Sequence, residues 1–372
     1  MTRVSYNGIT SASQADEEGS TPFTRSTFPM PTFATRLIDW QQSRGRHDLP
    51  WMGTTDPYRV WLSEIMLQQT QVATVIGYYT RFLARFPDLE ALAAAPVEEV
   101  MALWSGLGYY ARGRNLHACA RTLVLQHGGQ FPRDPAALVM LPGIGRSTAN
   151  AIAVFCFDAR VPILDGNVKR LLCRYLGITG FPGTSVVESR LWRDAAKLLP
   201  DRQVAAYIQA QMDMGATVCT RRQPRCTACP VADGCFARRE QRVAELPTPR
   251  PKKTLPERTI SLLVLRAENA VLLEARPPAG IWGGLLSLPE LPVGAEVVDF
   301  CARRLGARVS AVAPAPTFVH GFTHFRLRIQ PLVCAAAREL QLAEPALRWV
   351  EMDALAQAAL PAPIRAMLSA IP

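Results

Sequence analysis

The stretch Leu141-Pro-Gly-Ile-Gly-Arg-Ser-Thr-Ala-Asn150 joins two segments whose apolar residues recur at helical spacing. Its two glycines, Gly143 and Gly145, permit a tight hairpin and let the backbone approach another molecule closely. A helix is expected from Arg146 onward, and its free N–H groups could hold a phosphate oxygen. A Pro-Gly-x-Gly segment alone is more often a simple turn, so the surrounding sequence has to show whether this hairpin contacts another molecule.

Outward from this hairpin, residues 33–199 show helical spacing throughout. Asp56-Pro57 and Asp134-Pro135 mark helix starts, because aspartate caps a helix and proline is tolerated in the first turn. From Leu246 a stretch rich in Pro, Lys and Arg gives way to alternating residues at 259–266, 271–274 and 324–329. We therefore expect a helical half followed by a strand-rich domain from about residue 257.

Four cysteines lie between these halves with the spacing C-x6-C-x2-C-x5-C: Cys219, Cys226, Cys229 and Cys235. Thiolates this close together usually share a metal centre, which offsets their mutual repulsion. Zinc knuckles tend to come as two C-x2-C pairs, whereas one pair with longer, unequal arms suits the wider spread of sulfurs around a 4Fe-4S cluster. Zinc, or four thiols without a shared metal, are the alternatives.

Composition limits the class of protein. The chain has 372 residues, 49% of them apolar, which is enough for two or three domains with real cores. We find no apolar run near the roughly 20 residues of a membrane span and no secretory signal in residues 1–31, so we expect a cytoplasmic, non-membrane protein. Nine cysteines, mostly isolated, argue against a disulfide framework.

Charge points to a polyanionic partner. The net charge is +10, and residues 221–258 hold ten Lys or Arg against four acids. Such a stretch is either a solvated linker or lies along phosphate. With the cysteine motif beside it, the hairpin resembles that of the helix-hairpin-helix superfamily of DNA glycosylases, in which it grips one DNA strand without reading sequence.

A glycosylase needs an acid that helps the base leave and a carboxylate that stabilises the sugar cation. Glu64 lies among apolar residues on a predicted helix, where burial would raise its pKa and keep it protonated. An ordinary exposed glutamate is the alternative. Asp165 precedes a predicted helix at 168–176; it is expected to cap that helix, and a carboxylate anchored by N–H groups stays ionised at neutral pH.

The resemblance then becomes specific. From about Phe33 to the C-terminus the chain is similar to the adenine DNA glycosylase family, on Trp61-Leu-Ser-Glu-Ile-Met-Leu-Gln-Gln-Thr-Gln71, Gly106-Leu-Gly-Tyr-Tyr-Ala-Arg112, residues 141–148, Ile163-Leu-Asp-Gly-Asn-Val-Lys169 and the four cysteines. It implies a monomeric, nucleoid-associated enzyme with one 4Fe-4S cluster that removes adenine mispaired with 8-oxoguanine or guanine in double-stranded DNA.

The same resemblance implies roles for the catalytic residues. Glu64 would protonate N7 of the flipped adenine, and Asp165 would stabilise the sugar cation or a covalent intermediate. Asn167 matches a residue beside the nucleophilic water. Ser147 stands where some members carry a tyrosine and where the endonuclease III-like sister family has a Schiff-base lysine, so a monofunctional enzyme is expected. A bifunctional lyase, with Lys169 as its suspected amine, or a non-catalytic DNA-binding module are the alternatives.

Recognition residues are implied in the same way. Gln69 would insert into the base stack, Tyr109 would wedge beside the oxidised guanine, and Thr70, Leu107 and Gly108 would line that base. The adenine pocket would comprise Leu49, Trp51, Leu67, Val72 and Gln209, together with His47, where relatives carry Arg or Lys. Contacts to the DNA backbone are expected from Gly143, Gly145, Arg146, Lys169, Arg221, Arg222 and Arg225.

The C-terminal part resembles a Nudix domain. Gly284 and Glu290 keep the G-x5-E spacing, but residues 298–303 lack the acidic helix that binds magnesium, so hydrolase activity is not expected. A reader of 8-oxoguanine is implied instead, through Phe322, Thr323 and His324, with threonine where the usual residue is serine.

The fold class expected is multidomain: an all-α helix-hairpin-helix glycosylase core with an iron-sulfur cluster loop, followed by an α+β Nudix-like domain. We expect a disordered leader at 1–31, the helical glycosylase domain at 32–218, the cluster loop at 219–236, a basic Pro-rich linker at 237–256 and the Nudix-like reader at 257–372.

Overall fold

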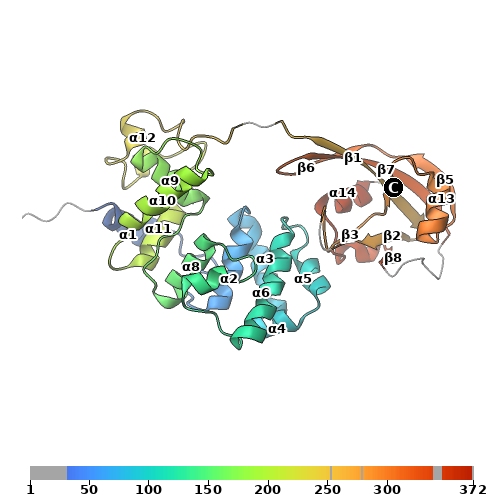
Figure 1. Ribbon diagram of the computed structural model, residues 1–372, viewed down its shortest axis with the longest axis horizontal. Coiled ribbons are helices and arrows are strands. Elements are labelled where there is room, and N and C mark those ends of the chain that lie inside the picture. The colour runs from blue at the N-terminus through green and yellow to red at the C-terminus, as the bar shows by residue number, and fades with distance from the viewer. Residues whose placement is uncertain (1–31, 252–253, 278–279, 338–345, 371–372) are drawn as a thin grey trace, which may run out of the picture.

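The computed structural model describes residues 32–251, 254–277, 280–337 and 346–370, so the leader expected at 1–31 lies outside the described residues. Helices fill the first part and a sheet the second (Figure 1). The first part contains α1 Phe33–Arg44, α2 Pro57–Leu67, α3 Val72–Arg85, α4 Leu89–Ala94, α5 Val97–Trp104, α6 Ala111–His127, α7 Pro135–Val139, α8 Arg146–Phe157, α9 Gly166–Leu176, α10 Ser185–Lys197, α11 Val204–Thr217, the 3-10 turn η1 Cys226–Ala228 and α12 Phe236–Arg239.

Two helix starts follow directly from the Asp-Pro pairs. Asp56 caps α2 by accepting a hydrogen bond from the Tyr58 N–H at 2.9 Å, and Asp134 caps α7 through the Ala136 N–H at 3.0 Å. In both helices proline occupies the first turn, where its missing N–H costs nothing. The starts predicted from these pairs are confirmed.

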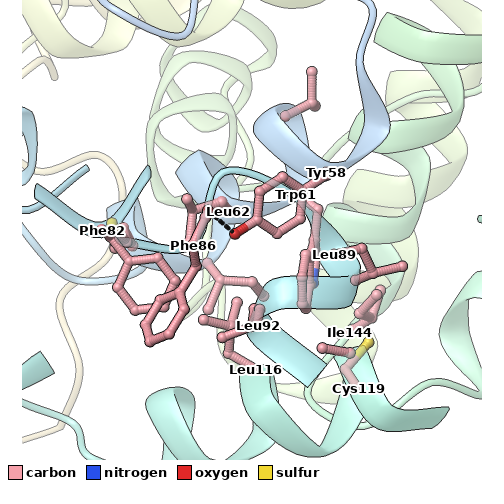
Figure 2. Close-up of a cluster of buried hydrophobic side chains, with 14 of the residues drawn as sticks. Tyr58, Trp61, Leu62, Phe82, Phe86, Leu89, Leu92, Leu116, Cys119 and Ile144 are labelled. Carbon is pink, nitrogen blue, oxygen red and sulfur yellow. Dashed lines mark hydrogen bonds between the residues drawn. The ribbon is translucent and has the colours of Figure 1, made fainter. Parts of the chain in front are cut away.

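The helical part has two hydrophobic cores. The first gathers buried side chains of α2 to α8, among them Trp61, Leu62 and Phe82 (Figure 2). Within it the Tyr58 hydroxyl donates to the carbonyl of Phe86 at 2.7 Å, which satisfies a phenol that burial has removed from water. Fully buried aromatic side chains of this size contribute much of the apolar area that stabilises a domain.

The second core is built by α1, α9, α10 and α11 together with one face of α8. Helix α8 belongs to both cores, with Ile152 packed in the first and Val154 in the second. At its N-terminal end, Gln68 at the end of α2 donates to the Thr148 hydroxyl at 3.3 Å, and the Leu164 N–H donates to the Ser147 hydroxyl at 3.1 Å. This end of α8 therefore holds the segment after Glu64 and the segment before Asp165.

The second part is one sheet with short helices: β1 Glu257–Ala267, β2 Ala270–Ala275, β3 Leu286–Ser287, β4 Glu290–Leu291, α13 Val297–Phe300, the π-helical turn η2 Cys301–Leu305, β5 Val309–Pro314, β6 Phe318–Gly321, β7 Arg326–Ala336, β8 Leu347–Glu351, the 3-10 turn η3 Asp353–Ala356 and α14 Ala362–Ala370. The central order is β3-β2-β1-β7-β5, with β1 and β7 parallel. The strand expected at 324–329 begins only at Arg326, because His324 lies in the turn after β6.

The two parts touch through α5 and α6. Met101 of α5 is buried in the core that α14 forms with one sheet face. The Ser105 hydroxyl donates to the Leu360 carbonyl at 2.7 Å and accepts from the Arg365 guanidinium at 3.3 Å, while Arg114 donates to the Gly283 carbonyl. No helix in the described segments is long and apolar enough to cross a membrane.

Candidate active site

The hairpin before α8 requires glycine at one position only. Gly143 has φ +76°, and a Cβ there would lie 2.7 Å from Cβ of Asn115. Gly145 is the N-cap of α8 with φ −86° and no atom within 4 Å of an added Cβ. The first turn of α8 is thus left open, with Arg146 exposed and its guanidinium 4.0 Å above the Trp192 ring. Free N–H groups at an open helix start suit an anion.

Glu64 lies on α2, and its carboxyl group is largely withdrawn from solvent. Burial, and to a lesser extent the negative charge of Asp165, together raise the pKa of Glu64 to about 7. This is the direction that the sequence predicts. Since the charge of Asp165 acts on Glu64, the two carboxyl groups belong to one site although 100 residues separate them in the chain.

Asp165 caps α9, as its position predicts. Its Oδ1 accepts from the Val168 N–H at 2.7 Å and its Oδ2 accepts from Nδ2 of Asn167 at 3.0 Å. Burial nevertheless raises the pKa of Asp165, and these hydrogen bonds only oppose that rise. Desolvation is therefore the larger effect on this carboxyl group, and its ionisation at neutral pH stays a prediction.

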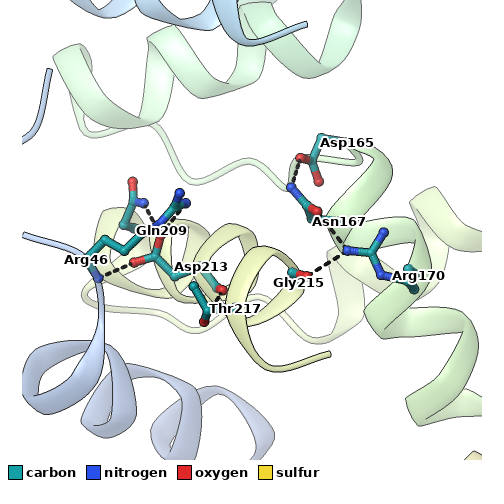
Figure 3. A network of polar contacts seen from close by, with 8 residues as sticks. All are labelled: Arg46, Asp165, Asn167, Arg170, Gln209, Asp213, Gly215 and Thr217. Atoms are coloured by element: carbon teal, nitrogen blue, oxygen red, sulfur yellow. Dashed lines mark hydrogen bonds and ion pairs between the residues drawn. The ribbon is translucent and has the colours of Figure 1, made fainter. Parts of the chain in front are cut away.

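Arg170, for which no role was expected from the sequence, continues this network (Figure 3). Its guanidinium donates to Oδ1 of Asn167 at 2.8 Å, to the Gly215 carbonyl at 2.7 Å and to the Cys219 carbonyl at 2.8 Å. Asn167 is thereby fixed from both ends of its amide. The signal available in the sequence was the spacing of three residues, which places Asn167 and Arg170 on one helix face.

A second polar network fixes the loop between α1 and α2 (Figure 3). Asp213 of α11 is fully buried and accepts from the backbone N–H of Arg46 at 3.0 Å, from its Nε at 2.8 Å and from Nε2 of Gln209 at 2.9 Å. This loop carries His47, Leu49 and Trp51. Sequence reasoning missed Asp213; its signal was that it is the one charged residue of α11.

The predicted recognition residues fall into two groups. Trp51 and Leu107 are buried in the first core, and Leu49, Leu67 and Val72 pack partly buried against it. His47 is exposed, with Nε2 3.0 Å from the Gln41 carbonyl oxygen. Gln69 and Tyr109 are also exposed, and both have left-handed backbone conformations, with φ of 56° and 49°. Such strained residues outside helices are often functional.

The four cysteines converge. Cys219, Cys226, Cys229 and Cys235 line one cavity whose wall includes Leu171, Val218 and Val231. Burial raises the pKa of the Cys229 thiol to about 11, so its thiolate needs a cationic partner. In the described part of the chain no group of three or more His, Cys, Asp or Glu side chains is arranged to hold one metal ion. The four thiols that line this one space are donors of the kind that a metal ion or an iron-sulfur cluster takes.

The basic side chains near the cysteine loop differ in exposure and in their protein partners. Arg221 and Arg222 are exposed, and Arg225, also exposed, donates to the Thr217 carbonyl at 2.8 Å. Lys169 instead pairs with Glu188 at 2.6 Å. An amine in an ion pair is poorly placed to attack a sugar or to contact phosphate unless the pair opens.

The loop after β6 presents Phe322, Thr323 and His324. Thr323 and His324 are exposed, and Phe322 stacks on Phe325 with ring centroids 4.5 Å apart. Glu290, the acid of the G-x5-E spacing, pairs with Arg276 at 3.1 Å. This loop thus combines two exposed polar side chains with a stacked pair of aromatic rings.

Comparison with known proteins agrees with this architecture. Residues 62–197 match the model for the HhH-GPD superfamily of base excision DNA repair proteins, and residues 261–370 match that for the NUDIX domain. A solved thermostable thymine-DNA glycosylase superposes with a TM-score of 0.52 at 27% identity, covering 56% of this chain and 95% of that one. The fold and site thus define a helix-hairpin-helix protein of base excision repair carrying a Nudix-like domain.

Two relatives narrow the assignment. The adenine DNA glycosylase of Buchnera aphidicola (Acyrthosiphon pisum) is 36% identical over 81% of this chain and 86% of its own length. That of Mus musculus is 34% identical over 88% of this chain and 75% of its own. The chain belongs to the adenine DNA glycosylase family.

Proposed function

We propose that this enzyme excises adenine mispaired with 8-oxoguanine or guanine from double-stranded DNA, acting as a monomer and without cutting the strand. The observation that carries the proposal is the pair Glu64 and Asp165: the charge of Asp165 helps burial to raise the pKa of Glu64 to about 7, and Asp165 itself caps a helix start. Membership of the adenine DNA glycosylase family supports the choice of base.

The proposed reaction has two steps. Glu64 transfers its proton to the adenine ring as the N-glycosidic bond breaks, and the bonding electrons leave with the neutral base. The sugar carbon becomes an oxocarbenium-like cation that the Asp165 carboxylate stabilises. A water molecule held by Asn167 then adds to the cation and loses a proton, which leaves an abasic site. Ser147 and the ion-paired Lys169 offer no free amine for strand cleavage.

DNA binding is assigned to three surfaces. The open first turn of α8, with Gly143, Gly145 and Arg146, would hold one phosphate, and Arg221, Arg222 and Arg225 would contact others. Gln69 and Tyr109 would fill the space that the flipped adenine leaves and press on the opposite base. Phe322, Thr323 and His324 would read the oxidised guanine from the Nudix-like domain.

A 4Fe-4S cluster is the cofactor that the four cysteines would hold. When bound, it would supply four metal-thiolate links that fix the loop from Cys219 to Cys235. The chain's own residues present Arg221 and Arg222 from that loop, and Arg170 joins the Cys219 carbonyl to Asn167. Purified protein is expected to be brown, with an absorption band near 400 nm that chelators of iron remove.

One assay tests the reaction. A duplex with adenine opposite 8-oxoguanine is incubated with the protein, and abasic sites are then cleaved with alkali. The expected result is a product that requires alkali and that disappears with Glu64→Gln. Cleavage without alkali would support the lyase alternative, and no product at all would support a binding module that lacks catalysis.

A further inference from the structure

The Arg112 guanidinium, at the start of α6, donates hydrogen bonds to two separate loops. One amino group donates to the carbonyls of Ile65, Met66 and Gln68, at 2.8, 2.9 and 2.6 Å. These oxygens belong to the last turn of α2, whose carbonyls have no partner within the helix. Arg112 therefore closes the end of the helix that carries Glu64.

The other amino group of Arg112 faces a different loop. It donates to the Leu107 carbonyl at 3.4 Å, the Gly108 carbonyl at 3.2 Å and the Thr70 hydroxyl at 3.0 Å. The same guanidinium lies 5.5 Å from the ring centres of Trp104 and Tyr109. One side chain thus connects residues 65–70 with residues 107–109.

Each of these loops contains one strained residue. The backbones of Gln69 and Tyr109 have φ of 56° and 49°, values that residues other than glycine rarely adopt. Such conformations persist only where the surroundings fix them. The Arg112 bonds fall on residues directly next to both, at Gln68 and Thr70 on one side and at Gly108 on the other. The hydrogen bonds of Arg112 therefore lie directly beside both strained residues.

We infer that Arg112 is a positioning residue that locks residues 68–70 and 107–109 into one rigid unit, which fixes Gln69 and Tyr109 relative to each other. The inference rests on the proposed function for its purpose, since these two side chains are the ones assigned to the emptied stack and to the orphan base. Fixing both before DNA binds avoids paying their ordering entropy during extrusion.

A planar fork is necessary for this role. Five acceptor carbonyls and one hydroxyl surround the guanidinium on two sides, and its two amino groups point in fixed directions toward them. Lysine keeps the charge but concentrates its donors at one point, so it can serve only one loop. Arg112→Lys is therefore the informative change, because it preserves charge and most of the volume.

The first experiment uses the free protein and does not depend on any activity. Amide hydrogen exchange is measured for the wild type, Arg112→Lys and Arg160→Lys. The control, Arg160, donates to the carbonyls of Leu199 and Pro200 at 3.1 and 3.0 Å, away from both loops. In Arg112→Lys, exchange in 65–70 and 107–109 is expected to rise together, about tenfold or more, with no change in the control. Faster exchange in one segment alone, or in neither, overturns the inference.

The second experiment connects the unit to recognition. Single-turnover excision of adenine opposite 8-oxoguanine and opposite guanine is compared, with 2-aminopurine fluorescence reporting extrusion. Arg112→Lys is expected to lower the extrusion of adenine, and to lower the ratio of the excision rate opposite 8-oxoguanine to that opposite guanine by about tenfold. The pH at which the excision rate has fallen to half its maximum should stay as in the wild type. An unchanged ratio and extrusion overturn the inference. If the wild type excises nothing, the proposed function fails. The exchange result still shows whether Arg112 holds residues 68–70 and 107–109 together.

Discussion

The proton on Glu64 depends on where the residue lies, because the same carboxyl group on an exposed helix face would be ionised at neutral pH. Burial on α2 and the nearby charge of Asp165 both disfavour the anion. Asp165 is half-buried like Glu64, but it has the Val168 N–H and Asn167 as partners. The two acids thus differ in hydrogen bonding rather than in burial, and that difference separates the proposed proton donor from the proposed stabiliser of the cation.

The pH dependence of excision follows from the raised pKa of Glu64. Because the protonated form is active, the single-turnover rate is expected to be high below about 7 and to fall about tenfold for each further pH unit. Glu64→Gln should reduce the rate by roughly 10²-fold or more at every pH. A rate that rises through pH 7, or a glutamine variant with the original profile, would contradict the assignment of Glu64 as acid.

Stability gives an independent check on the same group. A carboxyl group whose pKa is higher in the folded state contributes stability that is complete below its unfolded pKa of about 4.3 and is lost as pH rises through about 7. Glu64→Gln removes that loss. The unfolding free energy of the variant should therefore gain on that of the wild type between about pH 4.3 and 7 and run parallel to it above that range, as denaturant titrations at each pH would measure.

At the scale of elements, the hairpin and α8 organise the site. The hairpin leaves Arg146 exposed at the start of α8, and the next two residues of the same turn, Ser147 and Thr148, hold the approach to Asp165 and the end of α2. The serine hydroxyl thus has a structural partner in the Leu164 N–H. One helix start therefore aligns the segments that carry the two acids and is also the proposed phosphate contact.

The two hairpin glycines should respond differently to substitution. Gly143→Ala places a Cβ 2.7 Å from that of Asn115 at φ +76°, so it should lower the unfolding free energy by about 1–3 kcal/mol. Gly145→Ala meets no atom within 4 Å at φ −86° and should change it by less than about 1 kcal/mol. Chemical denaturation of both variants makes the comparison, and equal losses would refute the strained hairpin.

At the scale of the whole molecule, the Nudix-like part is joined to the helical part by contacts from the segment that carries Tyr109. Ser105 bonds to Leu360 and Arg365, and Arg114 bonds to Gly283, on either side of that residue. The beginning of the segment that leads to the sheet is held against the helical part. Arg174 donates to the Leu246 carbonyl at 2.8 Å, and the Gly180 N–H donates to the Thr248 hydroxyl at 3.0 Å. A truncation should therefore end after Arg250.

Removal of residues 251–372 is expected to keep some excision and to reduce the preference for 8-oxoguanine over guanine. Both the reader loop and the support of residues 105–109 are lost in that protein. Single-turnover rates on the two mispairs measure the effect, and Thr323→Ala in the full chain isolates the loop. If the truncated protein discriminates as well as the full chain, the reader assignment falls.

The sequence by itself determined the order of domains, the helix starts, the converging cysteines and the family, because capping residues, periodicity and motif spacing are local properties of the chain. It also marked Glu64 and Asp165 as the acids to examine. The effect of burial on Asp165 and the roles of Asp213, Arg170 and Arg112 were decided only by the tertiary structure. Desolvation and multi-partner hydrogen bonds depend on segments far apart in the chain, such as Arg46 with Asp213, and no local pattern encodes them.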